Sequence, residues 1–275
     1  MSSPQNPFSD PAAHQGTELQ SPVPPPSISP AAVENPVWSG WEVLALACVT
    51  LTAIFLFLIV VTLAAHRLAY SDVPWTEVAK YPGVIVLSQL LAYILVFSLM
   101  YFLVKRDHGQ DFWRAIRWNW PQKWSSYIFG GILLALGLQA FAHLLPMPKN
   151  LPIDQFFQTA REAYLLSIFG MSLAPLLEEL FFRGFLYPVL ARRLGMAAGI
   201  FLTALAFALI HGAQLMYAWG PVLVIFLVGL VLTLVRAVTK SVAASLLIHM
   251  AYNGTISLAM FAATSGFRHL ERLKQ

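Results

Sequence analysis

The chain has 275 residues, of which 58% are hydrophobic and only 11% are charged, and its mean hydropathy is +0.66. Soluble globular domains carry about 25% charged residues, so this composition excludes an ordinary soluble protein and indicates a polytopic membrane protein. The formal net charge of +4 does not predict a nucleic-acid partner, because the basic residues are scattered among loops and helix ends rather than gathered in one stripe.

Residues 1–38 are predicted to form a disordered tail rich in Pro and Ser. The stretch from Met1 to Asn35 contains no Lys or Arg and includes the run Pro24–Pro26, so it cannot bury enough apolar surface to fold. The apolar run that follows lacks the basic leader and the small-residue cleavage pattern of a secretory signal peptide. We therefore expect this run to be retained as a membrane helix.

Residues 39–267 are predicted to form a helical membrane domain, and residues 268–275 a short basic tail. Crossing a hydrocarbon core of about 30 Å takes about 20 helical residues, and runs suited to that role recur along the chain. We expect an all-α bundle of about seven transmembrane helices that encloses a polar cavity within the membrane. The expected spans are Val43–Ala65, Pro82–Val104, Trp124–Met147, Ala163–Leu190, Met196–Ile210, Gly212–Val235 and Ser241–Phe267.

The loop between the second and third spans predicts the orientation in the membrane. It holds the densest basic cluster, which the positive-inside rule places in the cytoplasm. With seven helices, the loops that carry Arg192 and Arg236 fall on the same side, whereas Arg268 and Arg272 near the C-terminus fall outside. This conflict leaves open whether the last segment is a simple crossing. The cluster comprises Lys105, Arg106, Arg114, Arg117 and Lys123.

Three charged residues lie in the expected span Ala163–Leu190, where a bilayer tolerates almost no charge, so they predict a functional site. Glu179 and Arg183 are four residues apart with the acid first, which favours an ion pair on one helix face. Glu178 lies about 100° around the helix and can point into a cavity. One glutamate is thus predicted to be structural and the other reactive. Pro175 is expected to kink or widen the helix just before them.

Two later spans carry isolated polar groups at helical spacing. Phe207 and His211 are four residues apart, so the ring can buttress the imidazole from the same helix face. His249 and Asn253 repeat that spacing on the last span. An imidazole can share a water or a metal ion with a glutamate, and paired His and Asn groups can stabilise a developing oxyanion. These are the parts that hydrolysis of a peptide bond needs.

Other signatures of hydrolytic enzymes are missing from the sequence. It has no His-Glu-x-x-His zinc motif, no Gly-x-Ser-x-Gly elbow and no serine or cysteine with an evident base. A water activated by a glutamate is the simplest mechanism left.

The polar residues form three motifs: Glu-Glu-x-x-x-Arg at 178–183, Phe-x-x-x-His at 207–211 and His-x-x-x-Asn at 249–253. Together they resemble the CPBP intramembrane protease family, which comprises CAAX prenyl endopeptidases and bacteriocin-processing or self-immunity (Abi) proteins. The resemblance covers about residues 163–262, the order of the motifs agrees, and no motif position departs from the family pattern.

The resemblance implies a role for each of six residues. Glu178 and His211 would position and activate the attacking water, and His249 with Asn253 would form the oxyanion hole. The resemblance also implies that the neighbouring pair, Glu179 and Arg183, supports the site. It leaves open whether a divalent metal such as zinc is required or only an activated water.

The expected function is that of an intramembrane endopeptidase in a lipid bilayer, acting on a membrane-anchored peptide or protein such as a prenylated CAAX-type tail. A non-catalytic bacteriocin self-immunity or scaffold protein of the same fold is the alternative. A secondary transporter also places charges at the membrane midplane, but we find no internal repeat of the transporter kind. The compact chain without an evident organelle-retention ending favours a bacterial plasma membrane over a eukaryotic endomembrane.

Overall fold

The computed structural model describes Met1, residues 34–148 and residues 155–274. The chain divides into two units, Met1–Ala32 and Val33–Gln275, and every helix described belongs to the second unit. The predicted disorder of the Pro- and Ser-rich tail therefore falls almost entirely outside the described residues.

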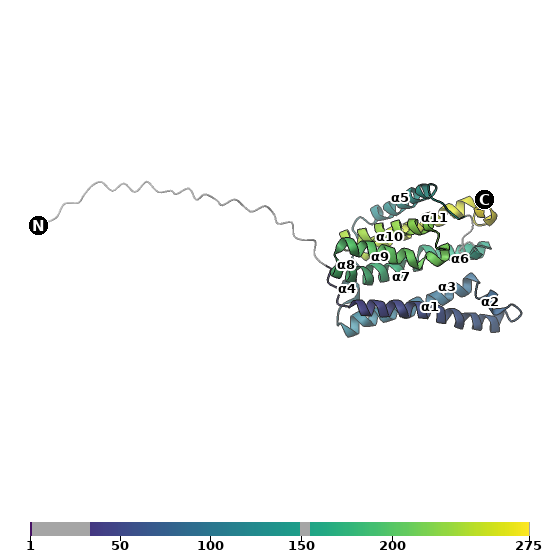
Figure 1. Ribbon diagram of the computed structural model, residues 1–275, viewed down its shortest axis with the longest axis horizontal. Coiled ribbons are helices and arrows are strands. Elements are labelled where there is room, and N and C mark those ends of the chain that lie inside the picture. Colours follow the sequence, from purple (N-terminus) through teal and green to yellow (C-terminus); the bar gives the residue numbers. More distant parts are fainter. Residues whose placement is uncertain (2–33, 149–154, 275) are drawn as a thin grey trace. The chain divides into compact units, whose positions relative to one another are not determined.

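The second unit is built from helices that lie side by side (Figure 1), and the described residues include no strand. Six helical segments are long and apolar enough to cross a membrane, and α9 is a shorter apolar helix. These findings confirm an all-α, multi-pass membrane protein of about seven helices. The segments are α1 (Gly40–Ala69), α3 (Pro82–Phe102) with its π-helical extension η1 (Leu103–Asp107), α5 (Trp124–Ala142), α6 to α8 (Ala160–Leu194), α9 (Met196–Ile210), α10 (Trp219–Thr239) and α11 (Val242–Ala263).

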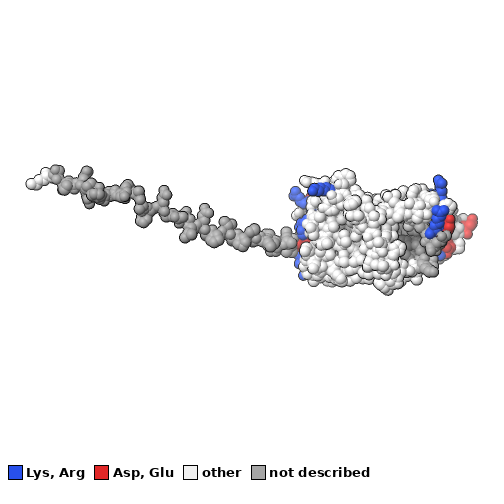
Figure 2. All heavy atoms as spheres, turned by 90° about the horizontal axis from the view of Figure 1, so that it is seen from above, with Lys and Arg blue, Asp and Glu red and all other residues white. Residues whose placement is uncertain are grey.

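Charged side chains gather at the two ends of this unit and leave the band between them white in the view of Figure 2. The short helix α4 (Phe112–Ala115) and α8 lie at one end, and the C-terminus lies at the opposite end (Figure 1). The C-terminus therefore lies at the opposite end of this unit from α4 and α8, which agrees with a count of about seven helices. The cytoplasmic orientation of those loops stays a prediction.

The start of α10 differs from the expected span Gly212–Val235. A 3-10 helix, η4 (Gly212–Leu215), comes first, and Met216 and Tyr217 then adopt left-handed backbone conformations. The α-helix begins only at Trp219, which places Pro221 in its first turn. Proline is tolerated there because the first N–H groups of a helix have no partner within the helix.

The span with the two glutamates is not one continuous α-helix. α6 (Ala160–Met171) ends at Ser172, whose backbone leaves the helical region, and α7 (Leu173–Glu179) follows. The helix is therefore interrupted three residues before Pro175, close to where the sequence predicts a kink. The π-helix η3 (Leu180–Leu186) comes next and leads into α8 (Tyr187–Leu194).

A proline accounts for the place of η3. Pro188 in the first turn of α8 has no N–H to donate to the carbonyl of Gly184, four residues earlier. The regular α-helical hydrogen bonding is therefore interrupted here. Wider π-helical turns are frequent at functional sites. In this chain the wide turn begins directly after Glu179 and contains Arg183.

The residues just before α1 are anchored to the helical unit. The Trp38 side chain is 1% exposed, stacks on Phe185 and donates its indole N–H to the Phe185 carbonyl. Glu34 is also buried and forms ion pairs with three basic residues, Arg117, Arg236 and Lys240. The structure thus moves the start of the folded unit from residue 39 to residue 34 at the latest, because long-range contacts supply the burial that the local composition does not predict.

A close approach of α5 to α11 predicts one sharp effect on stability. A Cβ at Gly131 would lie 2.5 Å from the Ile248 carbonyl oxygen and 2.7 Å from the Ala251 Cβ. We expect Gly131→Ala to lower the thermal unfolding temperature of the protein in detergent, since overpacking of this kind costs about 1–3 kcal/mol. Gly137→Ala on the same helix, where a Cβ meets open space, is the matched control. Equal unfolding temperatures for the two variants would contradict this packing.

The buried carboxylate of Glu34 predicts a dependence of stability on pH. Burial alone would raise its pKa, but Arg236, Lys240 and Arg117 outweigh burial and hold the pKa below its ordinary value of 4.5. A lowered pKa in the folded state stabilises the protein above about pH 4.5, and that stabilisation is lost as the pH falls through the folded-state pKa. The unfolding temperature of wild type should therefore exceed that of Glu34→Gln by a constant margin near neutrality, and the margin should shrink only in acid. A margin that stays the same in acid would contradict an ionised Glu34.

Candidate active site

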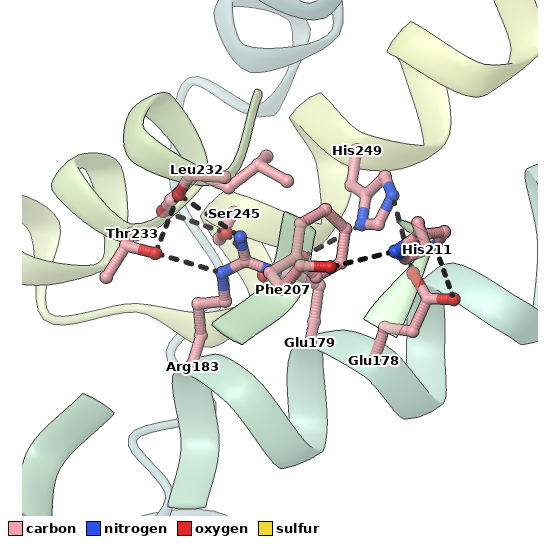
Figure 3. A network of polar contacts seen from close by, with 10 residues as sticks. Glu178, Glu179, Arg183, Phe207, His211, Leu232, Thr233, Ser245 and His249 are labelled. Carbon is pink, nitrogen blue, oxygen red and sulfur yellow. Dashed lines mark hydrogen bonds and ion pairs between the residues drawn. The ribbon is translucent and has the colours of Figure 1, made fainter. Parts of the chain in front are cut away.

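The predicted ion pair on the glutamate helix is present and fully buried (Figure 3). The Arg183 guanidinium donates from Nη1 to Glu179 Oε1 over 2.9 Å, and both side chains are 0% exposed. Two opposite charges taken out of water cost free energy unless further hydrogen bonds satisfy their remaining atoms. The neighbouring helices supply those bonds.

α10 satisfies the rest of the arginine. Arg183 donates from Nε to Thr233 Oγ1 and from Nη2 to the Gly229 carbonyl, each over 3.2 Å. Its guanidinium also lies 4.5 Å from the centre of the Phe207 ring, a cation–π contact. These contacts leave each guanidinium nitrogen with a partner, which is the condition for keeping the charge inside the bundle.

α11 satisfies the rest of the Glu179 carboxylate. Ser245 donates its hydroxyl to Oε2 over 2.5 Å, and His249 Nδ1 lies 2.8 Å from Oε1. A carboxylate only accepts hydrogen bonds, so Nδ1 of His249 carries the hydrogen. The other ring nitrogen, Nε2, is thereby left without a hydrogen in the neutral ring and is available for chemistry.

The His211 ring is set in the same way by its own backbone. Its Nδ1 lies 2.9 Å from the Phe207 carbonyl oxygen, again a pure acceptor. The ring centres of Phe207 and His211 lie 4.9 Å apart, which agrees with the expected buttressing contact. His211 sits at the C-terminal end of α9, and its Nε2 is the free nitrogen.

Both free nitrogens face Glu178 (Figure 3). Its carboxylate oxygens lie 4.0 Å from His211 Nε2 and 3.7 Å from His249 Nε2. These distances are too long for direct hydrogen bonds and suit a bridging molecule. Glu178 and His211 are 18% and 20% exposed, whereas Glu179 is 0% exposed. The two adjacent glutamates therefore differ in their surroundings, since Glu179 is sealed in the predicted ion pair and Glu178 is partly exposed. The reactive role of Glu178 stays a prediction.

The structure brings five of the six candidate residues into one network and places Asn253 one helical turn beyond it. Asn253 donates from Nδ2 to the Gly170 carbonyl over 2.7 Å and ties α11 to α6. An amide nitrogen carries two hydrogens, so this bond leaves one N–H for another acceptor. The expected joint action of His249 and Asn253 on one group stays a prediction.

Sequence reasoning did not identify Gly229, Thr233 and Ser245. A signal for Ser245 existed, because it precedes His249 by four residues and so lies on the same helix face. Gly229 and Thr233 share that spacing on α10, but Gly229 acts through its carbonyl, and no side-chain pattern reveals a backbone acceptor.

The sequence leaves open whether a metal ion takes part, and the positions of the side chains bear on that question. Among the residues that the structure describes, no group of three or more His, Cys, Asp or Glu side chains is arranged to hold a metal ion. Glu178 with the two Nε2 atoms is the relevant set, and its separations exceed hydrogen-bonding distance. Donor atoms that share a metal ion bind the ion rather than each other, so these separations leave the metal requirement to experiment, and the proposed chemistry uses the side chains alone.

The fold and this network define a multi-pass membrane protein with an ion pair, a free carboxylate and two imidazoles at its centre. Residues 159–255 match the family model described as "Rce1-like: Type II CAAX prenyl endopeptidase Rce1-like". This region of the chain is therefore similar to Rce1-like type II CAAX prenyl endopeptidases, in agreement with the resemblance to the CPBP family. The matched region runs from the start of α6 into α11 and includes all six candidate residues. No curated protein and no solved structure matches the chain.

The buried ion pair predicts that its two charges depend on each other. Glu179→Ala and Arg183→Ala should each lower the unfolding temperature and the yield of folded protein, since an unpaired buried charge costs about 3–5 kcal/mol. The double variant should be more stable than the sum of the two losses implies.

The exposed pair of Glu77 and Lys80 offers a matched control for this double-variant cycle. It lies on the surface, with side chains 53% and 54% exposed, and should show a coupling of less than about 1 kcal/mol. Thermal unfolding in detergent measures both couplings. Strictly additive losses at Glu179 and Arg183 would contradict the buried pair.

Proposed function

We propose that the protein is an intramembrane endopeptidase that hydrolyses a peptide bond in a membrane-associated peptide or protein. The observation that carries this proposal is the convergence of two imidazole Nε2 atoms on the partly exposed carboxylate of Glu178. In both rings a hydrogen bond at Nδ1 directs the free nitrogen inward. This arrangement is suited to holding and deprotonating a water molecule.

The proposed reaction begins with a water held between Glu178 and His211. Glu178 takes one proton from the water while the water oxygen attacks the carbonyl carbon of the scissile peptide bond. The lone pair on His211 Nε2 can accept the second hydrogen of the water, which orients its oxygen toward the carbonyl. The ion pair keeps Glu179 from competing, because its oxygens already accept hydrogen bonds from Arg183, Ser245 and His249.

The tetrahedral intermediate places negative charge on the former carbonyl oxygen. The free N–H of Asn253 can donate to it. A His249 ring that has taken a second proton from solvent before the attack can also donate from Nε2, and it keeps that proton through the reaction. The Glu179 carboxylate at Nδ1 would stabilise the resulting imidazolium. Glu178 then returns its proton to the leaving nitrogen as the carbon–nitrogen bond breaks. The products are a carboxylic acid and an amine, so no further reactant is needed.

The membrane setting supports a lipid-associated substrate. Glu178 lies near the middle of the candidate span Ala160–Leu194, and a peptide reaches that depth most readily when it is itself anchored in the bilayer. The Rce1-like domain supports a C-terminal CAAX-type prenylated tail as the substrate class. We further propose that the end with α4 and α8 faces the cytoplasm, since its loops carry the densest basic cluster.

Cleavage of a prenylated peptide reporter by purified protein in liposomes tests this function. Glu178→Gln and His211→Ala should each lower the cleavage rate by about 10²–10⁴-fold, the usual contribution of general acid–base catalysis, while folding is retained. Glu77→Gln and His143→Ala are matched controls with the same chemistry outside the network, and both should cleave like wild type. Full activity in Glu178→Gln would overturn the mechanism.

A metal requirement is decided in the same assay. Glutamate-activated water needs no metal, so a strong chelator should leave the wild-type rate unchanged. Loss of cleavage on chelation, with recovery on adding back a divalent ion, would instead assign a metal to this site. An absence of cleavage by wild type with every membrane-anchored reporter would shift the function to the non-catalytic immunity or scaffold role.

A further inference from the structure

Glu34, just before α1, holds three basic side chains together at one end of the bundle. Its Oε1 lies 3.1 Å from Arg236 Nη1 and 3.0 Å from Lys240 Nζ, and its Oε2 lies 3.3 Å from Arg117 Nε. The side chains of Glu34 and Arg236 are 4% and 1% exposed. Within the described part of the chain, Glu34 is the only acid that pairs with these cations, so its removal leaves a buried charge at Arg236 unbalanced.

Trp38, four residues after Glu34, packs against the π-helix η3. Its ring stacks on Phe185 with 4.3 Å between ring centres and an angle of 19° between planes. Its Nε1 donates to the Phe185 carbonyl over 3.0 Å. Phe185 follows Arg183 by two residues in the same wide turn. The contact therefore fixes the backbone that carries the buried arginine.

The contacts of Trp38 and of Glu34 act on Arg183 through two different helices, η3 and α10. Gly229, Thr233 and Arg236 follow each other at spacings of four and three residues, so they share one face of α10. The first two bind Arg183, and the third binds Glu34. Trp38 contacts η3, which carries Arg183. Glu34 contacts α10, which supplies two hydrogen-bond acceptors for Arg183.

From this arrangement we propose that Glu34 and Trp38 are positioning residues for the reactive centre. By fixing the positions of η3 and α10 relative to each other, they hold Arg183 against Glu179. Glu179 in turn orients the His249 ring so that its Nε2 faces Glu178. The expected effect on kcat rests on the proposed hydrolytic function. The orientation of the His249 ring does not, and it can be measured without any activity. No substrate contact is assigned to either residue.

Two conservative variants test the positioning role while retaining most of the packing. Trp38→Phe keeps an aromatic ring but removes the N–H donor, and Glu34→Gln keeps the shape but removes the charge. We expect each to lower kcat per folded molecule by about 10-fold with KM nearly unchanged, because small displacements of reacting groups slow the chemical step. The pH dependence of kcat should also shift, since His249 loses part of its fixed geometry. Trp41→Phe and Glu77→Gln, at exposed positions, should match wild type.

A second measurement separates positioning from plain stability and does not need catalysis. NMR of protein labelled with nitrogen isotope in histidine, in detergent micelles, reports which ring nitrogen of His249 carries the hydrogen. We expect the Nδ1–H form in wild type and Trp41→Phe, and shifted or averaged His249 signals in Trp38→Phe and Glu34→Gln. Unchanged His249 signals in both variants would overturn the proposal. If wild type cleaves nothing but the His249 signals respond as expected, the hydrolytic function fails and the positioning role stands.

Discussion

The buried pair of Glu179 and Arg183 is the interaction on which the rest of the site depends. Two full charges inside a helical bundle are tolerated only when every charged atom finds a partner, because desolvation of each ion is costly. The bundle meets this demand with hydroxyls and a backbone carbonyl from α10 and α11 and an aromatic face from α9. The same contacts that satisfy the pair also draw these helices around Glu178. The stability of the bundle and the geometry of the proposed active site therefore depend on one network.

The distribution of exposure explains how two adjacent glutamates take different roles. Glu179 is sealed from solvent and its oxygens accept three hydrogen bonds from neighbouring side chains, so it is not open to a ligand. Glu178 is 18% exposed and lacks any direct hydrogen bond from a described residue. The helical turn of about 100° between successive residues separates the two environments. The wide turn of η3 begins at this point and lets Arg183 reach α10 as well as Glu179.

Much of this could be predicted from sequence because the decisive spacings are local. The four-residue separation of Glu179 from Arg183 predicts their pairing, and apolar runs of about 20 residues predict the spans. Local patterns do not reveal what distant segments supply. Glu34 meets Arg236 across 202 residues, and its surroundings in the sequence resemble a disordered tail. The sequence likewise does not predict the π-helix. Pro188 predicts an interruption of the regular helical hydrogen bonds but not that a π-helix forms there.

The asymmetry between the two histidines follows from what binds their Nδ1 atoms. His211 is held by a neutral carbonyl of its own helix, so its free nitrogen is best suited to accept a hydrogen from water. His249 is held by a carboxylate that is itself paired with Arg183, so the two rings are oriented by different partners. Both rings nevertheless turn Nε2 toward the same glutamate. In the proposed hydrolysis, a peptide carbonyl placed beside Glu178 would meet the water held by Glu178 and His211, and the second N–H of Asn253 would be available for its oxygen.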